Sequence, residues 1–126
     1  HFACIGGQAV DATFVNGPRL LFADVKARPD GLGVHLVWAA EEPLPAGLHV
    51  FVHWRAGDQM LAQWDGPFGG ELLPAEVWRV GDQVEQSLIL AGAASADSAV
   101  WVGVYDFGSR DRLMTETGDD HVTIRP

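Results

Sequence analysis

Hydrophobic and polar residues alternate along most of the chain, with a period of two. Between Leu48 and Arg55, for example, Val50, Val52 and Trp54 occupy every second position, and no segment keeps apolar residues at the spacing of a helix. Successive side chains of a β-strand point to opposite faces of its sheet, so this alternation is typical of strands with one buried face. The pattern therefore predicts an all-β chain.

Typical turn sequences separate the alternating segments and set the strand limits. Asn16-Gly17-Pro18, Pro29-Asp30-Gly31 and Ala56-Gly57-Asp58 contain residues that tolerate the backbone angles of tight turns. Pro43 and Pro45 place the connection after the third strand outside any sheet interior. The expected strands are Ala9–Val15, Leu20–Ala27, Gly33–Ala40, Leu48–Arg55, Gln59–Asp65, Gln83–Leu90, Ala99–Asp106 and His121–Arg125.

Large apolar side chains share one face in the third, fourth and seventh expected strands. Two antiparallel sheets that pack such faces together form a β-sandwich. We therefore predict an immunoglobulin-like antiparallel β-sandwich of seven or eight strands, with residues 1–8 as an N-terminal segment and residues 9–126 as one domain. The expected inward residues are Val34, Leu36, Trp38, Val50, Val52, Trp54, Val100, Val102 and Val104.

The connections between strands carry further expectations. Leu72–Val80 has room for one helical turn, and Ala91–Ser98 is expected to form a surface loop because its residues are small and polar. Trp64 and Trp78 lie near turns, where a large ring typically covers one end of a sandwich.

Composition excludes several classes of protein. A chain of 126 residues with 48% hydrophobic residues has the size of one domain and is too apolar to be disordered. A net charge of −9 with a single lysine, Lys26, opposes nucleic-acid binding. No apolar run reaches the ~18 residues of a membrane helix, so we expect no direct membrane insertion of this chain. Cys4 is the single cysteine, which excludes an intrachain disulfide and leaves its role open.

Four segments together resemble a known family. They are Val50-Phe51-Val52-His53-Trp54, Leu61-Ala62-Gln63-Trp64-Asp65-Gly66-Pro67, Trp78-Arg79-Val80-Gly81 with Val84, and Val102-Gly103-Val104-Tyr105-Asp106 with Arg112-Leu113. Residues 16 to 114 are in this respect similar to soluble immunoglobulin-like β-sandwich modules of bacterial envelope proteins, of the kind appended to multi-spanning membrane glycosyltransferase-like proteins. The chain departs from the family at residues 107–111, which replace a Thr-Gly hairpin, and at Trp101, where a smaller residue is usual.

The resemblance implies a location and a class of partner. It implies an extracytoplasmic domain, in the cell envelope or secreted, that contacts a protein partner or a parent membrane protein. The family has no known catalytic residues, so none is carried over to this sequence.

Histidines and carboxylates in the sequence do not form a recognisable reaction centre. His49 and His53 lie four positions apart on a strand, roughly 13 Å, which is too far for one metal ion. His35 would join one of them only if the third and fourth strands were neighbours. Because G-x-S-x-G and D-x-D-x-D-G motifs are absent, we expect no enzyme activity, no metal and no cofactor. We expect a solvated acidic rim from Asp106, Asp111, Glu116, Asp119 and Asp120.

Outward-facing aromatic residues are the candidate contacts for a ligand or partner. Alternation places Trp101 opposite the inward valines of its strand and near Phe51, His53 and Tyr105, so we expect Trp101 to be at least partly exposed. A sugar, a protein partner and a covering loop all remain possible reasons for this ring. We predict a non-catalytic accessory module for protein–protein or interdomain contacts in the bacterial cell envelope. The alternative is a carbohydrate-binding module that uses these aromatics.

Overall fold

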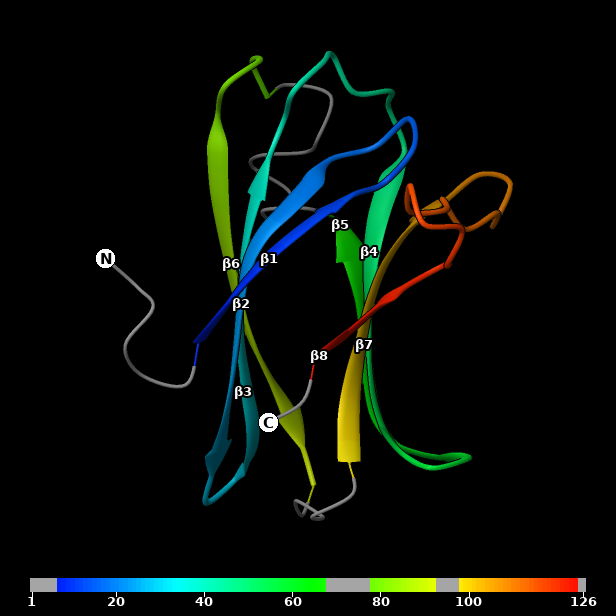
Figure 1. Ribbon diagram of the computed structural model, residues 1–126. Coiled ribbons are helices and arrows are strands. Elements are labelled where there is room, and N and C mark those ends of the chain that lie inside the picture. Colours follow the sequence, from blue (N-terminus) through cyan, green and yellow to red (C-terminus); the bar gives the residue numbers. More distant parts are fainter. Residues whose placement is uncertain (1–6, 68–77, 93–97, 125–126) are drawn as a thin grey trace.

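The protein is an all-β fold of two antiparallel sheets. A computed structural model describes residues 7–67, 78–92 and 98–124, and within these residues it contains eight strands (Figure 1). Sheet I has the strand order β1-β2-β3-β6, and sheet II has the order β5-β4-β7-β8. The strands are β1 (Gly7–Thr13), β2 (Arg19–Arg28), β3 (Gly31–Ala39), β4 (Leu48–Ala56), β5 (Gln59–Pro67), β6 (Gln83–Ala91), β7 (Ser98–Asp106) and β8 (Val122–Ile124).

All eight predicted strands are present, and their limits shift by a few residues. β1 starts at Gly7. It ends at Thr13, because the chain then turns through Asn16, which has a φ of 64°. The proline-containing connection between β3 and β4 lies outside both sheets, as expected. The expected helical turn over Leu72–Val80 falls largely outside the described residues, and Trp78 to Val80 are not helical. Cys4 and most of the expected loop Ala91–Ser98 also lie outside them.

The chain passes between the sheets three times. β1, β2 and β3 follow one another within sheet I, whereas the connections from β3 to β4, β5 to β6 and β6 to β7 each change sheet. As a result, β6 pairs with β3 in sheet I, and β7 pairs with β4 in sheet II. Figure 1 shows the two sheets facing each other, with the first two strands in blue and β8 in red.

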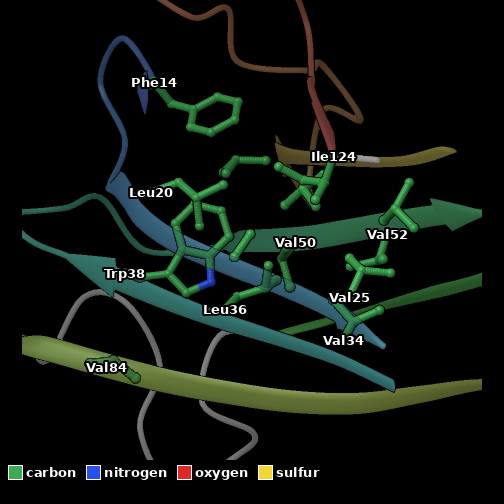
Figure 2. Packing of buried hydrophobic residues seen from close by; sticks show 14 of the residues in the cluster. Phe14, Leu20, Val25, Val34, Leu36, Trp38, Val50, Val52, Val84 and Ile124 are labelled. Carbon is green, nitrogen blue, oxygen red and sulfur yellow. The ribbon is translucent and has the colours of Figure 1, made fainter. Parts of the chain in front are cut away.

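The core fills the space between the sheets. All nine predicted inward residues of β3, β4 and β7 are buried, and none exposes more than 2% of its surface. Figure 2 shows Trp38 of sheet I against Leu20 and beside Val50 of sheet II. Its indole nitrogen donates a hydrogen bond to Gln86 Oε1 over 3.2 Å, which satisfies the polar atom inside the core. Trp78 joins this core and Trp64 packs partly buried against it.

A long connection follows β7 and holds the two sheets together at one side. Residues 107–121, here called the cover segment, lie between β7 and β8 and are coloured orange to red in Figure 1. Phe14 and Thr115 form an isolated antiparallel bridge. Val15 N donates to Met114 O over 2.8 Å on one side of this bridge. The cover segment of sheet II is therefore bonded to the first hairpin of sheet I.

Candidate functional site

The four candidate contact residues lie on the outer face of sheet II. Phe51 and His53 come from β4, and Trp101 and Tyr105 from β7. His53 is paired with Trp101 across the two strands. The ring centres of Phe51 and Tyr105 are 6.4 Å apart. Alternation therefore placed the residues on one face correctly, since their inward neighbours fill the core.

Three of these four candidate contact residues are buried. Phe51 exposes 2% of its surface, and His53 and Tyr105 each expose 8%. The cover segment packs on them: the Arg112 guanidinium lies 4.5 Å from the centre of the Phe51 ring. Strand alternation predicts which face a side chain occupies and carries no information on whether a distant segment covers that face.

Gly103 makes room for this packing. It is paired with Phe51 across β4 and β7. A Cβ atom at Gly103 would lie 2.1 Å from Phe51 Cζ and 2.9 Å from the backbone oxygen of Asp120. These distances are too short for any side chain, so the Phe51 ring and the cover segment occupy the space above Gly103.

Trp101 is partly exposed, as expected, and is contacted by one side chain from the cover segment and one from β4. The His121 ring, next to β8, stacks on it with centres 4.0 Å apart and an angle of 14°. The Arg55 guanidinium, from β4, lies 4.6 Å from the Trp101 ring centre. Coverage by the chain itself, one of the three possibilities raised above, therefore accounts for much of this ring.

Asp120 links these two parts of the face. Arg112 Nη1 donates to Asp120 Oδ2 over 2.9 Å, and His121 Nδ1 donates to Asp120 Oδ1 over 2.7 Å. The hydrogen bond from His121 and the contacts with Arg112 lower the pKa of Asp120 below its ordinary value. Asp120 thus has a structural role, and so does Asp106, whose Oδ1 accepts from Gly108 N over 2.8 Å. Neither is the purely solvated rim residue that the sequence predicted.

A groove of about 290 Å³ remains on this face, and we call it the sheet II groove. His53 Nε2 lies 4.0 Å from Asp65 Oδ1 at its wall. Burial lowers the pKa of His53, although Asp65 opposes this change, and burial raises the pKa of Tyr105. The groove can offer hydrogen bonds beside aromatic rings, which is the chemistry of polar ligand binding. It is lined by Phe51, His53, Gln63, Asp65, Tyr105, Arg110 and Arg112.

The histidine positions do not come together as a metal site. His49 stacks on Phe107 with ring centres 4.5 Å apart, and Phe51 lies between it and His53 on β4. His35 belongs to sheet I, so the condition under which it would approach them is not met. In residues 7–67, 78–92 and 98–124, no three His, Cys, Asp or Glu side chains are grouped so that they could hold a metal ion.

A second groove, on the outer face of sheet I, was missed in the sequence. Gly33 is paired with Lys26 of β2 and with Ile89 of β6, so a residue without a side chain lies between two long ones. The next row of the same face contains Asp24, His35 and Ser87. We call this space, of about 340 Å³, the Gly33 groove. A glycine inside an alternating strand was the available signal, since it often marks close approach of another group.

Ser87, His35 and Glu85 form a hydrogen-bonded chain beside the Gly33 groove. Ser87 Oγ lies 2.9 Å from His35 Nδ1, and His35 Nε2 lies 3.1 Å from Glu85 Oε1. A serine, a base and an orienting carboxylate are also the parts of a hydrolase nucleophile. Here Ser87 is the direct cross-strand partner of His35, and Glu85 lies two residues along the same face. Ordinary pairing between neighbouring strands therefore accounts for both contacts.

Comparisons with known proteins do not assign a family. No protein-family model, curated protein or solved structure matches the chain. Within the described part of the chain, no helix has the length and hydropathy needed to cross a membrane.

Proposed function

We propose that this chain is a non-catalytic accessory module that binds a protein partner or a parent membrane protein. The observation that supports this proposal is that the cover segment packs on the outward-facing aromatic residues of sheet II. Sugar binding by ring stacking uses the open face of an aromatic ring, whereas Phe51 and Tyr105 are buried and Trp101 is stacked on His121. The Gly33 groove, in contrast, has exposed charged and apolar side chains along its walls, as a partner-binding surface requires.

The finer assignment, to an immunoglobulin-like envelope module, rests on topology and on the motif resemblance. In immunoglobulin-type sandwiches, Greek-key connections place strands that are distant in sequence next to each other. The pairings of β6 with β3 and of β7 with β4 agree with such connections. An extracytoplasmic location is the part of the proposal that follows from the resemblance alone.

Carbohydrate binding is the second candidate, and the sheet II groove favours it. Gln63 and Asp65 are exposed at the wall of this groove beside Phe51 and Tyr105. Amide and carboxylate groups next to aromatic rings can bind sugar hydroxyl groups.

Site-specific photo-crosslinking tests the proposal. A photoreactive amino acid is placed at Ile89 on sheet I, at Gln63 on sheet II, and at Val15 as an exposed control, in the organism that encodes the chain. We expect a single defined protein to be crosslinked from position 89 and not from position 15. Absence of any protein adduct, together with saturable binding on a glycan array that Gln63→Ala abolishes, would favour the sugar alternative.

An activity measurement tests the non-catalytic part. A fluorophosphonate probe labels serines that a neighbouring base activates. We expect no labelling of the wild-type chain above that of Ser87→Ala. Labelling that both Ser87→Ala and His35→Ala abolish would make the Ser87–His35–Glu85 chain a reaction centre and overturn this part of the proposal.

A further inference from the structure

The Gly33 groove is a shallow depression that crosses strands β2, β3 and β6. Lys26, Gly33 and Ile89 form one row from β2 to β6, and the missing side chain in its middle leaves the depression. Neighbouring strands are about 4.8 Å apart, so the outer residues of this row are separated by about 10 Å. A Cβ at Gly33 would lie 3.0 Å from Arg28 Cδ, so the Arg28 side chain follows one wall of the groove.

The charged side chains of β2 in this groove have few partners within the described residues. No ion pair of Lys26 occurs within the described residues, and Arg28 has one exposed contact, from its Nε to Asp30 Oδ1 over 3.5 Å. Asp24 Oδ1 is buried and has no hydrogen-bond partner there. Ile89 exposes 51% of its surface. Lys26, Arg28 and Ile89 are therefore the side chains of this groove that are available to contact a partner.

The charges of the groove define what fits into it. Two cations stand together at one end, on a chain whose net charge is −9. They attract a carboxylate, while Ile89 beside Gly33 accepts an apolar side chain. In an extended peptide, side chains two positions apart point to the same side and are separated by about 6.6–6.8 Å. An acidic residue and an apolar residue two positions apart can therefore both point into the groove.

We propose that the Gly33 groove binds an extended segment of a partner protein with an acidic residue, any residue and an apolar residue in sequence. The carboxylate lies between Lys26 and Arg28, and the apolar side chain lies over Gly33 against Ile89. Among the described residues, no Phe, Tyr or Trp lines this groove, which favours a peptide over a sugar. This inference rests on the proposed function and names the chemistry of the partner.

An NMR titration of the chain tests it with defined peptides. The probe is the amidated peptide Gly-Ser-Glu-Ser-Leu-Ser-Gly, and the matched probes replace Glu by Lys or Leu by Ser. We expect saturable shifts of the Gly33 and Ile89 amide signals with the first peptide and at least tenfold weaker binding with each of the others. Binding should also weaken as salt is added, because exposed charges are screened.

Variants of the chain locate the contact. Lys26→Glu with Arg28→Glu should weaken binding at least tenfold, and so should Ile89→Ser, while Arg79→Glu, an exposed cation outside the groove, should leave it unchanged. Circular dichroism checks that each variant is folded. No saturable shift at Gly33 and Ile89, equal weakening by Arg79→Glu, or shifts confined to Phe51 and Tyr105 would each overturn the inference.

The crosslinking experiment and the peptide titration test the proposed function and the acidic-segment inference separately. A protein crosslinked from position 89 together with no binding of any peptide would remove the acidic-segment inference and keep the proposed function. Peptide binding in vitro without a protein adduct in cells would remove the proposed function.

Discussion

The outer face of sheet II is covered by another part of the chain, whereas part of the outer face of sheet I is open. On sheet II, the cover segment packs on the aromatic residues of β4 and β7, and its arginine and histidine side chains stack on their rings. On sheet I, the row of Lys26, Gly33 and Ile89 remains open. The difference follows from the connections. Residues 107–121 are long enough to cross a sheet face, whereas β2 and β3 are joined by the two residues Pro29 and Asp30. Chain length between neighbouring strands thus decides which face is available to a partner.

Removal of a core side chain should reduce the free energy of unfolding more than any change on either outer face. Trp54 is completely buried between the sheets, and Trp54→Ala should reduce the free energy of unfolding by about 3–5 kcal/mol. Chemical denaturation measures this loss. A loss below about 1 kcal/mol would mean that the inward set of β4 is assigned to the wrong face, and the distinction between inner and outer faces would fail with it.

A pair of glycine substitutions compares the two outer faces directly. Gly103→Ala should cost about 2–3 kcal/mol, because the new methyl group would overlap Phe51 and the backbone of Asp120. Gly33→Ala should change stability by less than about 0.5 kcal/mol, since its nearest neighbour is the flexible end of Arg28. Urea titrations of both variants measure the two effects. Equal losses of unfolding free energy in the two variants would show that the two faces do not differ in how closely they are packed.

The stacking on Trp101 should have a smaller effect. Truncation of a surface side chain without close neighbours usually changes the free energy of unfolding by about 0.5 kcal/mol or less. The stacked His121 ring and the nearby Arg55 raise the expectation to about 1–2 kcal/mol. A double-mutant cycle with His121→Ala should give a coupling of at least about 0.5 kcal/mol. Additive losses would indicate that the cover segment does not depend on this contact.

The smallest expected effect is a dependence of stability on pH at the closed face. Burial lowers the pKa of His53 in the folded state below its ordinary value of 6.5. As pH falls through 6.5, the unfolded chain binds a proton that the folded chain resists, so the free energy of unfolding decreases. His53→Gln should lose less stability than the wild type between about pH 7 and pH 5. Parallel curves, measured by urea titration at each pH, would mean that His53 is not desolvated by the cover segment.

Much of the fold could be predicted from sequence, because strand alternation is a local property. Val50, Val52 and Trp54 specify the buried face of β4 by themselves. The closed state of Phe51 and Tyr105 could not be predicted, since it depends on Arg112 and Asp120, which come from a segment far along the chain. The Gly33 groove depends on the pairing of β2, β3 and β6, and its register is visible only in the folded sheet.

The bridge between Phe14 and Thr115 can form only late in the synthesis and folding of the chain. Its two residues lie about 100 positions apart, so the loop that it closes includes most of the chain. The entropy lost on closing a loop increases with its length, and contacts between distant positions slow folding. On a ribosome, the first hairpin emerges long before Thr115 is synthesised. Until residues 107–121 follow, Phe51 lacks its cover, and the nascent chain exposes an aromatic ring that the finished protein buries.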